Sequence, residues 1–180
     1  IVENTHQVLS SWKDRGEPYP DHRIGGACLL LTQAFQKYLP SNREQKTVAV
    51  IGSTKPWIES MLLHYQFSTI TTVEYNIPYC THPSIQFLSY YKDFSSVNTS
   101  LQYDVIVSYS SIEHSGLGRY GDMINPTGDL QAIKEIHRHL KKDGLLFLGV
   151  PVGPDAVVWN AHRVYGSIRL PILIKQFRVV

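Results

Sequence analysis

The sequence has few cysteines, with only Cys28 and Cys80 among its 180 residues. They form neither a C-x-x-C pair nor a close cluster with histidines, which excludes the common zinc sites. A chain of this length buries roughly two thirds of the surface that it exposes when unfolded, so its folding requires no disulfide or metal. The two cysteines therefore need not pair.

An excess of one charge and a long apolar run are also missing. The chain has 17 Lys and Arg against 15 Asp and Glu, a net charge of +2. No basic stretch is interleaved with aromatic residues, so no nucleic-acid partner is indicated. The longest apolar run, 144–152, has about half the length of a membrane span, and nothing resembles a signal peptide. We expect no membrane segment and favour the cytoplasm as the location.

The composition indicates one compact domain. The chain has 43% hydrophobic and 18% charged residues and no internal repeat. We divide it into an N-terminal helical segment, 1–46, that packs on a sheet, and an α/β domain, 47–180. Because the chain begins at Ile1 and ends in a strand-like run, 177–180, we expect a fragment cut at its C-terminal edge, with that run as a candidate sixth strand.

Periodicity predicts how the domain is built. Apolar residues at a helical period predict helices at 5–13, 27–39, 56–65 and 128–140. Short β-branched and apolar runs predict strands at 47–51, 70–74, 85–90, 104–108 and 145–150. Lys141 and Lys142 favour the C-terminal end of the last helix, and Asp143 and Gly144 predict the turn before the last strand. This order predicts an α/β, Rossmann-like fold with a mainly parallel sheet and helices on both faces.

In such a sheet the loops after the strands lie on one edge, where ligands bind. Glu74 ends the second strand about 20 residues after Gly52, the separation at which a carboxylate accepts hydrogen bonds from ribose hydroxyls. The alternative is a solvated carboxylate at a strand end. The loop that begins at Gly52 keeps a single glycine. Its Ser53 or Thr54 can cap the next helix, whose N-terminus attracts negative charge, although capping is also an ordinary structural role.

The densest polar segment, 110–122, follows the fourth strand. Its Glu113 and His114 can form an acid/base pair or supply ligands to a divalent cation, and Arg119 can bind a carboxylate or phosphate bidentately. A histidine beside a glutamate can also be a structural hydrogen-bonding group. Polar residues from a second loop, after the fifth strand, favour a ligand site at the same edge; they are Asn160, His162 and Arg163.

From Thr47 onward, the chain resembles class I S-adenosylmethionine-dependent methyltransferases in the order of the segments TVAVIGS, TVEYN, YDVIVSYSSIEHSG and LKKDGLLFLGVPVG. The resemblance implies that Gly52 approaches the methionine part of the cofactor and that Glu74 binds its ribose. It also implies that Lys92 or Asp93 flanks the adenine.

Two narrower resemblances concern the segment after the fourth strand. Some methyltransferases of quinone biosynthesis bind a divalent metal through a Glu-His pair there, which implies a metal hypothesis for Glu113 and His114. The chain also resembles an uncharacterised family first described from nematodes, domain of unknown function 268, in SSIEHSGLGRYGDMINPTGD and NAHRVYGSIRLP. That family implies the same methyltransferase-like fold and supplies no established reaction.

The first loop departs from the methyltransferase pattern, because Val50 replaces the usual acid and Thr54 and Pro56 replace the later glycines. Our leading prediction is an S-adenosylmethionine-dependent, methyltransferase-like protein that acts on a small molecule. The alternatives are a transferase acting on a phosphorylated or nucleotide-linked sugar, and a non-catalytic binding module with a degenerate cofactor loop.

The predicted site residues fall into three groups, and no metal is assigned to them. Those expected to bind the cofactor are Gly52, Ser53, Glu74, Asp93 and Ser110. Those expected to be catalytic are His114, as the general base, with Glu113, Tyr120 and His162. Those expected to bind the substrate are Arg119, Asp122, Asn160 and Arg163.

Overall fold

A five-stranded parallel sheet forms the centre of the molecule, with the strand order β3-β2-β1-β4-β5. The structure is a computed structural model and describes residues 25–77, 82–96 and 100–180. The strands are β1 (Val48–Ile51), β2 (Ile70–Glu74), β3 (Ile85–Ser89), β4 (Tyr103–Tyr109) and β5 (Leu140–Gly149). All five lie at predicted places, so the predicted α/β fold with a parallel sheet is confirmed.

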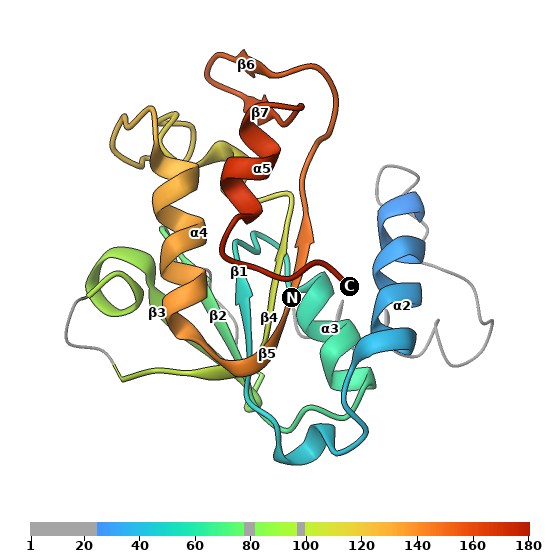
Figure 1. Ribbon diagram of the computed structural model, residues 1–180. Helices are drawn as coiled ribbons and strands as arrows, with labels where there is room; N and C mark the ends of the chain where they lie inside the picture. The colour runs from blue at the N-terminus through green and yellow to red at the C-terminus, as the bar shows by residue number, and fades with distance from the viewer. Residues whose placement is uncertain (1–24, 78–81, 97–99) are drawn as a thin grey trace.

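Helices cover both faces of the sheet (Figure 1). On one face lie α2 (Gly25–Tyr38) and α3 (Trp57–His64), and on the other lie α4 (Gly128–His139) and α5 (Arg169–Ile174). Three short helical turns complete the connections: η1 (Arg43–Gln45), η2 (Tyr90–Phe94) and η3 (Ile112–His114). The predicted helix at 5–13 lies outside the described residues.

The central strand β1 explains the two hydrophobic cores. Val48 and Val50 pack in the core under α2 and α3, whereas Ala49 and Ile51 pack in the core under α4 and α5. All four are buried, because successive side chains of a strand point to opposite faces and both faces of this sheet are covered. The continuous apolar run in the sequence has this physical cause.

The turn predicted at Asp143 and Gly144 does not separate the helix from the strand, because both residues belong to β5, which begins at Leu140 directly after α4. Within the strand, residues 141–144 form a bulge: Tyr103 pairs with Leu140, but Val105 already pairs with Leu145. Asp143 adopts a φ of 60° there. The bulge turns Lys141 towards β4, where its Nζ donates to Asp104 Oδ2 at 2.8 Å.

The C-terminal part also differs from the prediction. A two-stranded antiparallel hairpin, β6 (Ala156–Val158) and β7 (His162–Val164), lies beyond the carboxyl end of β5 (Figure 1), and residues 177–180 form no strand. Phe177 packs its ring on His137 of α4, with centroids 5.3 Å apart, and its N–H donates to Ile174 O. Residues 177–180 therefore add no sixth strand to the sheet.

Among the described residues, no helix combines the length and the apolar character that crossing a bilayer requires.

Candidate functional site

A cavity of about 370 Å³ lies at the carboxyl ends of β1, β2 and β4. It is the edge of the sheet at which the sequence predicts a ligand, and its volume falls within the range of roughly 300–1,000 Å³ that small-molecule sites occupy. Its wall includes the predicted residues Gly52, Ser53, Glu74, Ser110, His114 and Tyr120.

Gly52 is required where the loop after β1 meets the loop after β4. Its φ is 76°, in the left-handed region, and a β-carbon placed on it would lie 2.0 Å from Ser111 Oγ. Its N–H donates to Val73 O of β2 at 3.0 Å. A side chain at this position would both strain the backbone and collide with Ser111, so the single glycine of the loop has a definite structural role.

The Glu74 carboxylate lies in the cavity wall beside this loop. Oε1 accepts a hydrogen bond from the Ser53 N–H, and Oε2 accepts one from the Tyr75 N–H at 3.2 Å. Burial raises the pKa of Glu74, and the two amide hydrogen bonds oppose that rise. Each oxygen still has a second lone pair, so the carboxylate can accept further hydrogen bonds from a ligand in the cavity.

Aromatic rings make up much of the remaining wall. Tyr75 and Tyr90 pack with centroids 4.9 Å apart, and Trp57 and Tyr109 with centroids 5.8 Å apart. The Tyr75 hydroxyl donates to Ser115 Oγ at 3.2 Å, and burial raises its pKa to about 12. Among the described residues that line the cavity, none is a lysine or an arginine.

The loop 115–123 closes one side of the cavity and is fastened to the ends of β2 and β3. Asn76 Nδ2 donates to Tyr120 O at 2.9 Å, and the Met123 N–H donates to the Tyr91 hydroxyl at 3.3 Å. The buried Asp122 carboxylate accepts hydrogen bonds inside this loop from the N–H groups of Gly116 (2.6 Å), Gly118 (3.3 Å) and Tyr120 (3.2 Å). Asp122 thus stabilises the loop from within and does not line the cavity.

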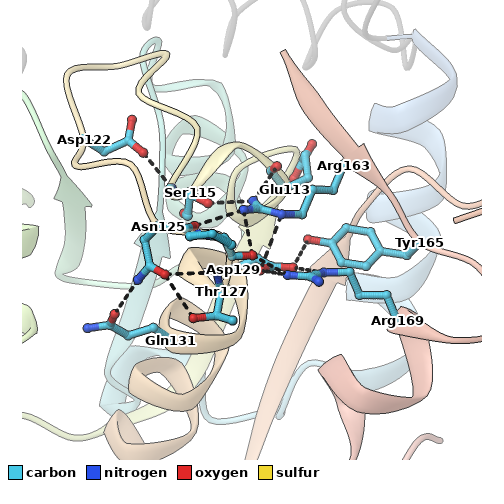
Figure 2. A network of polar contacts seen from close by, with 12 residues as sticks. Glu113, Ser115, Asp122, Asn125, Thr127, Asp129, Gln131, Arg163, Tyr165 and Arg169 are labelled. Carbon is cyan, nitrogen blue, oxygen red and sulfur yellow. Dashed lines mark hydrogen bonds and ion pairs between the residues drawn. The ribbon is translucent and has the colours of Figure 1, made fainter. Parts of the chain in front are cut away.

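Arg163 of β7 holds the same segment from behind (Figure 2). Its Nη1 donates to the carbonyl oxygens of Glu113 (3.3 Å) and Ser115 (2.6 Å). Its Nη2 donates to those of Asn125 and Pro126, both at 3.3 Å. The side chain is only 2% exposed. These contacts engage its guanidinium within the protein, and Arg163 does not line the cavity.

Asp129, at the start of α4, is the acidic partner of this cluster (Figure 2). Its fully buried carboxylate lies 3.6 Å from Arg163 Nε and accepts a hydrogen bond from Arg169 Nη2 at 2.5 Å. It also accepts one from the Tyr165 hydroxyl at 3.1 Å. The buried ion pair therefore joins α4, β7 and α5 beneath the loop.

His114 faces the cavity, and Glu113 lies behind it. The imidazole Nδ1 lies 2.5 Å from Ala161 O, and Nε2 lies 3.7 Å from Glu113 Oε1. Since a carbonyl oxygen only accepts, we assign a hydrogen to Nδ1. The buried Glu113 carboxylate has no hydrogen-bond partner within the part of the chain that the structure describes. The rings of Tyr120 and His162 lie 5.4 and 6.4 Å from the His114 ring.

The remaining predicted residues lie outside the cavity wall. Asp93 is exposed and accepts a hydrogen bond from the Ser89 N–H at 2.8 Å, which caps η2. Asn160 is exposed in the hairpin turn, and the exposed Arg119 lies over the ring of Tyr120 at 5.8 Å. Across residues 25–77, 82–96 and 100–180, no three His, Cys, Asp or Glu side chains are grouped to hold a metal ion.

The sequence analysis missed Glu59, which is fully buried on α3 and hydrogen-bonded to Ser53 of the first loop. No signal in the sequence marks this residue, because the burial of Glu59 beside Ile58 and Ser60 is decided by the fold, and acids are almost never fully buried without a partner.

Comparisons with known proteins place the chain in a family and relate its fold to solved structures. A family model described as "Caenorhabditis protein of unknown function, DUF268" matches residues 45–180. The chain is similar to a protein from the complex between the Haloferax volcanii Trm112 methyltransferase activator and its candidate methyltransferase, with 13% identity, 93% of this chain and 74% of that chain covered, and a TM-score of 0.59.

It is also similar to the Burkholderia thailandensis 1,6-didemethyltoxoflavin-N1-methyltransferase, solved with 1,6-didemethyltoxoflavin and S-adenosylhomocysteine. The identity is 14%, the coverage is 97% of this chain and 72% of that chain, and the TM-score is 0.55. At these identities the likeness establishes a methyltransferase-like fold. A search of the curated proteins gives no match.

Proposed function

The chain belongs to DUF268, the family of Caenorhabditis proteins of unknown function, and we propose that it is a methyltransferase that binds S-adenosylmethionine and acts on a small molecule. The position of Glu74 carries the proposal. In a methyltransferase-like fold, this acid ends β2 and presents its carboxylate to the cavity beside the loop that begins at Gly52.

The residues of the cavity fit such a cofactor. Glu74 keeps lone pairs that can accept hydrogen bonds from ribose hydroxyls, and Tyr75 and Tyr90 offer apolar ring surface next to it. Aromatic faces also attract a cationic centre, and the wall has no lysine or arginine among its described residues to oppose one. When bound, the cofactor supplies an activated methyl group.

His114 is the proposed general base of the reaction. Its Nδ1–H is held by Ala161 O, so in the neutral ring Nε2 carries the free lone pair and takes up the proton of the acceptor. Glu113 Oε1, 3.7 Å from Nε2, stabilises the resulting imidazolium. Tyr120, next to His114 in the cavity wall, positions the acceptor. Because methyl transfer depends mainly on alignment, these few groups suffice.

The two other functions receive less support from the geometry. A phosphorylated or nucleotide-linked sugar needs a cation to hold its phosphate. Arg163 already donates to carbonyl oxygens of its own chain, and the exposed Arg119 does not line the cavity. A non-catalytic binding module would have the same cavity and could bind a ligand there, but it would not transfer a methyl group.

The proposal is tested by isothermal titration calorimetry with S-adenosylmethionine and S-adenosylhomocysteine. We expect both to bind the wild type, and Glu74→Gln to weaken binding about 10- to 100-fold, because a hydrogen bond to a charged group contributes about 1.5–3 kcal/mol. Asp143→Asn is the matched control. It alters an exposed carboxylate in the bulge of β5, outside the cavity wall, and should change the affinity by less than about twofold.

Absence of heat with either compound, for a wild type that unfolds cooperatively, would contradict the proposal. Equal losses in the two variants would refute the assignment of Glu74. Binding of S-adenosylhomocysteine that His114→Gln leaves intact, as we expect, separates the proposed base from the residues that hold the cofactor.

A further inference from the structure

Glu59 is a fully buried acid that connects the first loop to the sheet. Its carboxyl group lies between Ser53 of the loop and Thr72 of β2, both of which are also buried. Oε1 lies 2.7 Å from Thr72 Oγ1, and Oε2 lies 2.9 Å from Ser53 Oγ. Its contacts are therefore with hydroxyl groups, and within the described part of the chain it makes no ion pair of 4.0 Å or less.

The hydrogen atoms of this group can be counted. Ser53 Oγ lies 2.8 Å from Lys55 O as well as 2.9 Å from Glu59 Oε2, but a hydroxyl has one hydrogen to donate. If Glu59 were ionised, the Ser53 hydroxyl could donate either to Lys55 O or to Glu59 Oε2. Its oxygen would then face the other acceptor with no hydrogen between the two oxygens. A proton on Oε2 resolves the conflict, because Glu59 then donates to Ser53, and Ser53 donates to Lys55 O.

The surroundings favour the same state. The charged neighbour that acts on Glu59 is Glu74 on β2, another acid, and the side chain of Lys55 in the first loop is exposed. Burial, followed in smaller measure by the repulsion from Glu74, raises the pKa of Glu59 to about 7, although hydrogen bonds from Thr72, its own backbone and Ser53 oppose the rise. An unpaired charge is costly in a buried position, so the neutral acid is the stable form.

We propose that Glu59 is a neutral carboxylic acid in the folded protein and that its proton fixes the first loop in the conformation in which the Ser53 N–H faces Glu74. Glu59 is thus a positioning residue. It acts on the cavity through Ser53, whose side chain it holds and whose backbone N–H binds the Glu74 carboxylate. The part of this inference that concerns cofactor binding rests on the proposed function, whereas the protonation of Glu59 does not.

The first experiment compares wild type with Glu59→Gln by thermal unfolding across pH. The folded-state pKa is raised, so the contribution of Glu59 to stability is complete below the unfolded value and is lost as the pH rises through about 7. The Gln amide can donate to Ser53 at every pH. We expect equal melting temperatures at about pH 4 and a variant that melts roughly 5 °C higher at about pH 8.

Glu44→Gln is the matched control, since Glu44 is exposed and loses the same charge. It should follow the wild type at every pH. A Glu59→Gln variant that is no more stable than the wild type at about pH 8 overturns the proposal.

A second measurement needs no variant. In a carboxyl-carbon NMR titration of protein labelled at glutamate, we expect the resonance assigned to Glu59 to have a midpoint near 7, accompanied in the infrared by the C=O band of a protonated carboxylic acid. The assignment is needed because burial also raises the pKa of Glu74. If the resonance assigned to Glu59 titrates near the ordinary glutamate value, Glu59 is ionised at neutral pH and the proposal fails, whether or not Glu59→Gln folds.

The third measurement is the affinity for S-adenosylhomocysteine as a function of pH. Wild-type affinity should fall by up to about tenfold for each pH unit above about 7, whereas that of Glu59→Gln should stay level. Failure of both proteins to bind at any pH refutes the proposed function and leaves the protonation of Glu59 to the first two measurements. Binding with the same pH profile in both proteins refutes the positioning role.

Discussion

Arg163 of β7 and Asp129 of α4 form a buried ion pair, with 3.6 Å between Nε and Oδ1, directly behind the loop that closes the cavity (Figure 2). The two residues are far apart in the sequence, and they meet because β7 lies against η3, which itself lies against α4. The pair fixes the shape of the loop, and it gives the first prediction.

Replacing Arg163 by methionine should lower the free energy of unfolding by about 3–5 kcal/mol, because breaking a buried pair leaves uncompensated polar groups. The carbonyl oxygens of Glu113, Ser115, Asn125 and Pro126 would each lose one hydrogen bond. Urea denaturation monitored by fluorescence measures the change. Arg119→Met, at an exposed arginine of the same predicted site, should cost about 0.5 kcal/mol or less. Similar losses in the two variants would show that Arg163 is not the centre of the cluster.

The second prediction concerns acid stability at the opposite end of the sheet. Asp104 at the start of β4 accepts hydrogen bonds from Lys46 at 3.0 Å, from Lys141 at 2.8 Å and from Thr47. Burial alone would raise the pKa of Asp104, but these hydrogen bonds outweigh it and hold the pKa well below its ordinary value.

Because the folded-state pKa is lowered, the stabilisation by Asp104 is complete above the unfolded value of 3.8 and is lost as the pH falls towards the folded one. Asp104→Asn should therefore lose about 1–2 kcal/mol at about pH 7 and converge with the wild type in strong acid. Chemical denaturation at several pH values tests this. Asp143→Asn, at an exposed aspartate in the β5 bulge, should show no such convergence. A constant deficit for Asp104→Asn across the whole range would contradict the prediction.

The third prediction concerns the contact between Gly52 and Ser111. Gly52→Ala should cost about 2–4 kcal/mol, because the new β-carbon adds a collision with Ser111 to the strain of a positive φ. In the double variant with Ser111→Gly the collision disappears, and only about 1 kcal/mol of backbone strain should remain. A double-mutant cycle from urea denaturation measures this coupling. Additive effects would mean that the two loops do not touch.

The fold was predictable where burial sets the pattern. A strand covered on both faces must be apolar throughout, so β1 could be located from its residues, and the apolar stripe of α4, with Ala132, Ile133 and Ile136, located that helix. By contrast, the strand Ala156–Val158 is exposed and only three residues long, so it leaves no periodic signal. The helix α5 has only six residues, too few for a helical period to be recognised.

For the candidate site, strand-end spacing could indicate Gly52 and Glu74, because topology brings strand ends together. It could not show that Asp122 and Arg163 bind the backbone of their own chain. Nearly every residue offers the same backbone N–H and C=O groups, so the sequence does not reveal which of them a polar side chain will contact. Glu59 could not be predicted for a different reason. Helical periodicity locates apolar stripes and does not reveal that an acid is buried beside one. The chemistry of a polar residue depends on partners that only the folded chain selects.

The contacts of Arg163 also bear on the order in which the molecule assembles. They join residues 48 and 50 positions apart, from Ser115 and Glu113 to β7, and such distant pairings form slowly because the intervening chain must first be confined. A nascent chain can complete β1 to β4 before β7 leaves the ribosome. We therefore expect the wall of the cavity around His114 to be among the last parts to become native, so that ligand capture marks the end of folding rather than its beginning.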